Sequence, residues 1–161
     1  MEDCGNIQLY GRGDCMFMGE YHHNIDAKGR LIIPTKFRQQ LDSCFVLTRG
    51  MDGCLFGYSL SKWHQLEQQL QKLPLTKQSA RSFIRFFYAA AAECEFDKQG
   101  RINISSTLIE YANLSKNCVI AGVLDRIEIW DEDAWQQTSA ETAQNFTQTS
   151  EELRDLFDLN L

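Results

Sequence analysis

Two short stretches of the chain repeat one pattern of charged and turn-forming residues. The first is Asp26-Ala27-Lys28-Gly29-Arg30 and the second is Asp97-Lys98-Gln99-Gly100-Arg101. Aspartate is favoured at the first position of a type I turn, and glycine adopts the positive φ that closes a bulged hairpin. Arginine can bind a phosphate or a guanine edge through two hydrogen bonds, and lysine meets a phosphate as a point charge. The pattern therefore predicts two hairpin turns whose cations suit a polyanion.

The same residues also have a purely structural interpretation. Asp26 and Arg30 flank the first turn, as Asp97 and Arg101 flank the second. Each pair can therefore form an ion pair across its own hairpin. One arginine can do both, and the spacing leaves the two interpretations open.

The repetition extends beyond the turns. Residues 25–33 are echoed by residues 96–104, a separation of 71 residues, and Trp63 is echoed by Trp135. We therefore predict two copies of one unit, at 20–62 and 91–134, each running strand, turn, strand, short helix, strand, strand. The expected class is mainly β with helices, that is α+β.

Two further bases follow the first turn. Lys36 and Arg38 fall on the short helix that Pro34 opens, where we expect them to extend the positive patch of that turn. The matching helix of the second copy, about residues 107–112, carries no base. This difference favours the first copy as the stronger binder.

A helical connector is expected between the copies, at residues 63–90. It comprises two helices separated at Pro74, which ends the first apolar run. On the second helix, Phe83, Phe87 and Tyr88 share an apolar face, which predicts packing against the rest of the fold. Lys77, Arg81 and Arg85 recur at helical spacing, a pattern typical of a solvated helix face.

The two ends differ from the middle of the chain. We interpret residues 1–15 as an N-terminal extension, either disordered or a start-site artefact. Residues 138–161 form a polar, acidic tail or loose helix with a small apolar end, Leu153, Leu156 and Phe157.

Composition narrows the classes of function. The chain has 161 residues and a net charge of −6, yet residues 16–130 hold 14 bases and 11 acids, so nucleic acid is permitted as a partner. We expect no transmembrane helix and no export signal. The six cysteines lack a C-x-x-C pair and are expected to be reduced thiols, with no metal, no cofactor and no catalytic motif.

These residues resemble the MraZ family of bacterial transcriptional regulators. The resemblance rests on Met16–Tyr21, on Ile25–Arg30 followed by Pro34, on Glu93-Cys94-Glu95, and on both D-x-x-x-R motifs. It runs from Met16 to about Trp135, which is most of the chain.

The resemblance implies a fold of two tandem SpoVT-AbrB-like swapped-hairpin repeats that pack into a pseudo-symmetric double-split β-barrel. It also implies homo-oligomeric rings, and binding of double-stranded DNA at direct repeats in the promoter of the division and cell wall gene cluster, which includes the family's own gene. It further implies a cytoplasmic, nucleoid-associated repressor or activator that is not an enzyme. The family's D-x-x-x-R residues correspond to Asp26, Arg30, Asp97 and Arg101.

We therefore predict a sequence-specific DNA-binding regulator that contacts DNA through Lys28, Arg30, Lys36 and Arg38, with Asp26 orienting Arg30. Ser105 stands where the first copy has Pro34, which again favours the first copy. The alternative is a protein-binding, antitoxin-type AbrB-like module that acts through its tail. A stoichiometric second protein that co-purifies would favour that alternative. An enzyme with a cysteine or carboxylate site in the barrel is a weaker hypothesis still.

Overall fold

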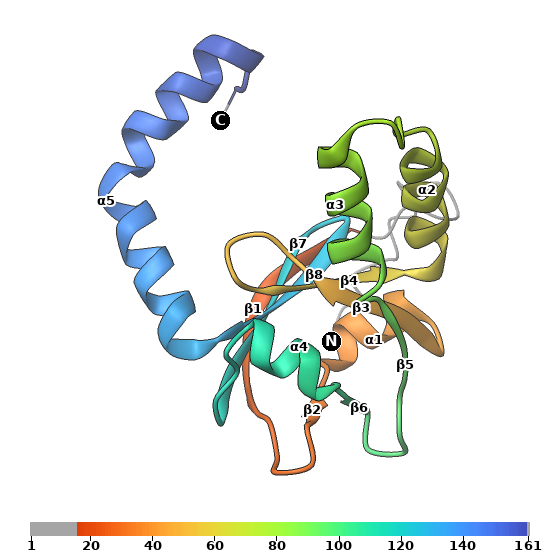
Figure 1. The fold of residues 1–161 in the computed structure, drawn as a ribbon. Helices are drawn as coiled ribbons and strands as arrows, with labels where there is room; N and C mark the ends of the chain where they lie inside the picture. Colours follow the sequence, from red (N-terminus) through yellow and green to blue (C-terminus); the bar gives the residue numbers. More distant parts are fainter. Residues whose placement is uncertain (1–15, 161) are drawn as a thin grey trace, which may run out of the picture. The chain divides into compact units, whose positions relative to one another are not determined.

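The computed structural model describes residues 16–160 (Figure 1). The expectation for residues 1–15 falls outside this range. The first copy contains β1 (Phe17–Asn24), β2 (Arg30–Ile32), α1 (Thr35–Leu41), β3 (Cys44–Arg49) and β4 (Leu55–Ser59). The connector contains α2 (Leu60–Gln71) and α3 (Gln78–Tyr88). The second copy contains β5 (Ala92–Glu95), β6 (Arg101–Asn103), α4 (Ser106–Tyr111), β7 (Asn117–Leu124) and β8 (Arg126–Asp131), and α5 (Glu132–Phe157) follows.

The strands of the two copies are exchanged. A six-stranded antiparallel sheet has the order β1-β7-β8-β4-β3-β5, and β2 pairs with β6 in a separate two-stranded ribbon. The first strand of each copy thus pairs with the third strand of the other, β1 with β7 and β5 with β3. The α+β class and the tandem repeat are confirmed, while the double-split barrel stays a prediction.

The ribbon is anchored by its middle residues. Leu31 of β2 and Ile102 of β6 face each other and are almost completely buried, at 0% and 1% exposure. Phe37 of α1 lies in the same core, with the rings of Phe17 and Tyr21 edge-on at 5.7 and 5.2 Å. Since side chains alternate along a strand, the flanking residues of β2 and β6 point away from the core.

The connector differs from its prediction in one respect. It is a pair of helices lying side by side (Figure 1), but none of the residues of α3 is buried. Phe83, Phe86 and Tyr88 are 42%, 50% and 43% exposed. Tyr88 stacks on Trp63 of α2 with ring centroids 5.7 Å apart, and the Phe87 ring lies tilted against the same Trp63 at 5.6 Å. Phe86, which was not part of the predicted face, packs edge-on against Tyr111 at 5.5 Å. The expected burial of the apolar face is therefore wrong for Phe83, whose ring stacks on Phe87 of its own helix and stays exposed.

The last helix, α5, forms a unit of its own. It has 26 residues, acidic side chains in its first turn and no buried residue. Its exposed apolar residues include Phe146, Leu156 and Phe157. No helix in residues 16–160 combines the length and apolar character needed to cross a bilayer.

We predict that Leu31→Ala lowers the free energy of unfolding by about 2–5 kcal/mol, because it leaves a cavity under the ribbon. Equilibrium urea denaturation measures the change. Met51→Ala is the control, since Met51 is 65% exposed in a turn and its truncation is expected to change stability by less than about 0.5 kcal/mol. Equal losses of stability in the two variants would contradict the anchoring role of Leu31.

Candidate nucleic-acid interface

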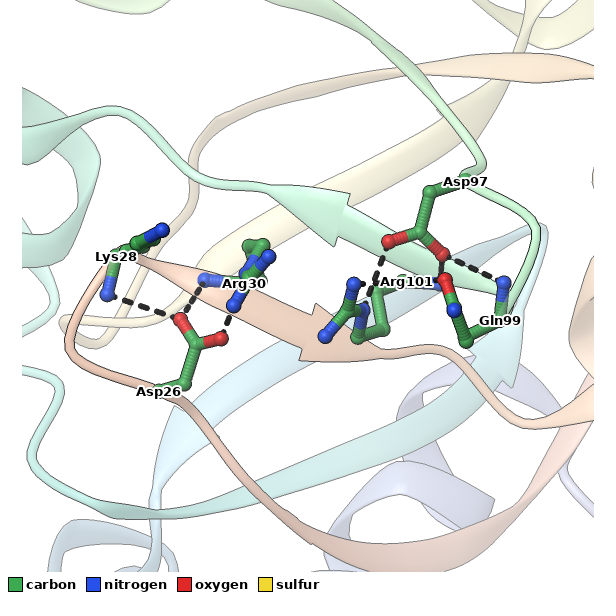
Figure 2. Close-up of polar contacts among 6 residues, drawn as sticks. All are labelled: Asp26, Lys28, Arg30, Asp97, Gln99 and Arg101. Carbon is green, nitrogen blue, oxygen red and sulfur yellow. Dashed lines mark hydrogen bonds and ion pairs between the residues drawn. The ribbon is translucent and has the colours of Figure 1, made fainter.

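The first turn is organised around the carboxylate of Asp26. Its Oδ1 accepts hydrogen bonds from the backbone N–H groups of Lys28 and Arg30, both at 2.9 Å. Its Oδ2 accepts from Nε of Arg30 at 2.6 Å (Figure 2). The N–H of Gly29 donates to the Asp26 carbonyl, and Gly29 has a φ of +78°, a conformation that residues with a Cβ rarely adopt. The carboxylate therefore closes the turn and fixes the arginine at once.

The second turn repeats this geometry bond for bond. Asp97 Oδ1 accepts from the backbone N–H groups of Gln99 and Arg101 at 2.9 Å, and Oδ2 accepts from Nε of Arg101 at 2.7 Å. Gly100 has a φ of +76°. The ion-pair interpretation of both D-x-x-x-R motifs is thus confirmed.

The ribbon brings the two motifs onto one face. In its register Arg30 lies opposite Asn103, and Ile32 lies opposite Arg101. These four residues have the same parity in the pleat, so they share the face opposite to the buried Leu31 and Ile102. Arg30 and Arg101 are diagonal neighbours on that face, with Cα atoms about 7–8 Å apart. Because β2 and β6 are antiparallel and each follows its own turn, the two turns lie at opposite ends of the ribbon. Figure 2 shows the two arginines between them.

The carboxylates stay charged at neutral pH and above. The pKa of Asp26 lies below its ordinary value of 3.8, chiefly because the backbone N–H of Arg30 donates to it, with burial opposing and the Arg30 side chain adding to the effect. The pKa of Asp97 is lowered in the same way by the backbone N–H of Arg101. Each turn still keeps an excess positive charge, since Lys28 and Lys98 are added to the paired arginines.

The ion pairs leave the ends of the arginines available. The Arg30 side chain is 36% exposed and that of Arg101 is 27% exposed. Within residues 16–160 no hydrogen bond holds the Nη groups of Arg30, and Arg101 has one long contact, from Nη2 to Gln99 Oε1 at 3.4 Å. Each guanidinium therefore has an oriented edge with free donors.

The predicted bases of α1 divide between two environments. Lys36 is exposed. Lys28, which lies in the first turn and not on α1, is exposed as well. Arg38 is partly buried: its Nε donates to the Ile33 carbonyl at 2.9 Å and its Nη2 donates to Thr35 Oγ1 at 2.8 Å.

Arg38 lies against the second turn and not the first. Its guanidinium sits over Gly100, where any Cβ would collide with it. At the equivalent place in the other half, the Cδ1 of Ile109 covers Gly29, 3.2 Å from where a Cβ would be. The exchange of strands thus brings the helix of each copy to the turn of the other, so the two turns are more alike in charge than the sequence alone indicates.

Two residues of the ribbon and its turns were not predicted as site residues. Lys98 lies within the second motif, and its sequence position alone would have marked it. Asn103 shares the ribbon face with Arg30, which only the strand register reveals. No cluster of three or more potential metal ligands occurs in the described part of the chain.

Comparison with known proteins identifies the family. The sequence model of the family described as "MraZ protein, putative antitoxin-like" matches residues 16–86 and again 87–157. The chain belongs to the MraZ family. Among its relatives, the protein named "Transcriptional regulator MraZ" from Ligilactobacillus salivarius (strain UCC118) is 61% identical over 144 residues, which is 89% of this chain and 100% of the relative.

Relatives of the same name from two other bacteria agree. The Lactiplantibacillus plantarum protein is 61% identical over 140 residues, covering 87% of this chain and 99% of the relative. The protein from Limosilactobacillus reuteri (strain DSM 20016) is 59% identical over 138 residues, covering 86% of this chain and 97% of the relative. The predicted membership of the MraZ family is confirmed.

We predict that Asp26→Ala lowers the melting temperature more than Asp26→Asn. The Asn side chain keeps an oxygen for the two backbone N–H groups but cannot accept from Arg30 Nε, whereas Ala removes all three bonds. Differential scanning calorimetry at neutral pH measures the order. Because folding lowers the pKa of Asp26, its contribution is present above pH 3.8 and is lost as the pH falls through the lower folded-state value. The difference between wild type and Asp26→Ala should therefore shrink in acid, and a constant difference would contradict the assignment.

Proposed function

We propose that the chain is a non-enzymatic, sequence-specific regulator of transcription that binds double-stranded DNA through the exposed face of the β2–β6 ribbon. The observation that carries this proposal is the pair of arginines, each oriented by its own carboxylate, on one face of the ribbon. The major groove of B-DNA, about 12 Å wide, admits a two-stranded β-ribbon. Relatives named as transcriptional regulators support the same conclusion.

The chemistry of each residue follows from its place. The free edges of Arg30 and Arg101 suit the O6 and N7 atoms of guanine or a phosphate. Lys28, Lys36 and Lys98 are exposed cations suited to phosphates. Asp26 and Asp97 position the arginines by accepting hydrogen bonds from their Nε atoms. They do not contact DNA, because phosphates repel carboxylates. Arg38 holds the second turn and adds to its positive potential.

The target and setting are carried over from family membership. We propose direct repeats in the promoter of the division and cell wall gene cluster, including the protein's own gene, as the binding sites. The site of action is then the nucleoid within the cytoplasm. We also keep the division into repeats at 20–62 and 91–134, a connector at 63–90, and a tail at 138–161.

Self-association is part of the proposal. One ribbon supplies few cations, so binding at physiological salt needs several ribbons on one duplex, where linkage raises the effective concentration. The aromatic face of α3, namely Phe83 and Phe86 at helical i, i+3 spacing, is 42% and 50% exposed, a surface of the kind that subunits bury. A homo-oligomeric ring that uses this face would place ribbons on successive DNA repeats.

A protein-binding module is the second candidate. Helix α5 exposes Leu153, Leu156 and Phe157 beside an acidic end, and the family description includes the word antitoxin-like. Such a module would act through residues 138–161 and would co-purify with a second protein in fixed ratio. DNA binding that persists without that partner would favour the regulator.

We predict that Arg30→Ala and Arg101→Ala weaken binding to the duplex upstream of the protein's own gene. The log–log salt slope should flatten by about 0.9 for each phosphate that the variant no longer neutralises. Arg30→Lys keeps the charge but removes the two-pronged donor edge, so it should keep the slope and abolish the preference over a scrambled duplex. Fluorescence anisotropy across a salt series measures both quantities.

The control is Lys72→Ala, which removes an exposed charge at the end of α2. It should leave both slope and preference unchanged. Wild-type protein that shows neither salt dependence nor preference would overturn the DNA-binding proposal.

We predict that Phe83→Asp lowers the mass of the assembly in light scattering, because a charge in the aromatic face opposes its burial between subunits. Met51→Asp, which places the same charge on an exposed turn, should keep the wild-type mass. A wild-type monomer, or equal masses for wild type and Phe83→Asp, would contradict self-association through α3.

A further inference from the structure

The exposed face of the ribbon is nearly, but not fully, symmetric. Arg30 and Arg101 occupy equivalent positions of the two copies, as do Ile32 and Asn103. The ribbon's contacts are reciprocal too, since the N–H of Ile33 donates to the Gly100 carbonyl at 3.1 Å and the N–H of Ile104 donates to the Gly29 carbonyl at 2.8 Å. The backbone therefore has an approximate two-fold axis, which the side chains Ile32 and Asn103 break.

Both of these side chains face outward. Ile32 is a large apolar side chain with 38% exposure, and Asn103 is exposed next to the first turn. Its Oδ1 lies 3.5 Å from where a Cβ on Gly29 would be. In the described range, 16–160, neither end of the Asn103 amide is used in a hydrogen bond. Asn103 and Ile32 thus occupy equivalent positions at the two ends of one face, where one presents an amide and the other a branched alkyl group.

A symmetric ribbon cannot tell the two orientations of a duplex apart. If both ends carried the same side chains, the ribbon would read the same bases on the two strands, and its preferred site would be a palindrome. An orientation can be read only where equivalent positions differ in chemistry. Asparagine pairs with the N6 and N7 edge of adenine, and apolar side chains contact the methyl group of thymine.

Resting on the DNA-binding function proposed above, we propose that Asn103 and Ile32 are specificity-determining residues that give the ribbon a direction on DNA. Arg30 and Arg101 contact a guanine edge or a phosphate at the positions where the two half-sites are the same. Asn103, beside Arg30, selects adenine in one half-site, and Ile32, beside Arg101, selects thymine through its methyl group in the other. One subunit then recognises a near-palindrome whose halves differ at one base pair.

The test is selection of bound duplexes from a randomised library, followed by sequencing. Wild type should enrich a site whose halves differ. Asn103→Ile and Ile32→Asn each make the two ends alike, so both variants should enrich a site with equal halves and disfavour the wild-type base pair by about tenfold. The double exchange, Ile32→Asn with Asn103→Ile, should enrich a site in which the base preferences of the two halves are interchanged.

Two results separate this inference from the function on which it rests. No enrichment by wild type would overturn the DNA-binding function itself. Enrichment by wild type, with the same bases selected by Asn103→Ile and by Asn103→Ala, would overturn the direction-setting role and leave the DNA-binding function intact. Thermal unfolding shows that each variant is folded, and Met51→Ala should select the wild-type site.

Discussion

The antiparallel pairing of β2 with β6 is the interaction on which the functional face depends. It joins the two copies, and it buries only Leu31 and Ile102 of the six residues involved. A slip of one residue in this pairing would turn the arginines toward the core and the aliphatic residues toward solvent. The two buried side chains therefore set the register, and the register in turn brings Arg30 and Arg101 onto one surface.

Within each turn the main effect of the carboxylate is to orient the arginine, and its contribution to the free energy of folding is smaller. Exposed ion pairs contribute little free energy because water already solvates both charges. The same carboxylate, however, also binds two backbone N–H groups, so that the turn and the Arg Nε are fixed together. A fixed guanidinium loses less rotamer entropy on meeting an anion, which is the advantage of preorganisation. The structural and functional interpretations of the motif are thus two consequences of one geometry.

The sequence predicts much of this molecule and fails where contacts depend on the other copy or on a partner. Turn chemistry and the repeat predict both hairpins and the order of strands, because these are local. The position of Arg38 over Gly100 was not predictable, since spacing does not say which copy a helix packs against. The exposure of Phe83 was missed for a similar reason, because an apolar helix face has the same pattern whether its own fold or another subunit covers it.

Fusing the two repeats in one chain has a physical consequence. Two identical chains that exchanged hairpins would form a symmetric ribbon, because every substitution would appear at both ends. In a tandem chain the equivalent positions can diverge, as they do in Ile32 and Asn103, in Lys28 and Gln99, and in Arg38 and Ile109. The connector that carries α3 also occurs once per ribbon instead of twice. An interface built on α3 then repeats once for each ribbon, so an assembly formed through it would keep every ribbon in the same orientation relative to its neighbour.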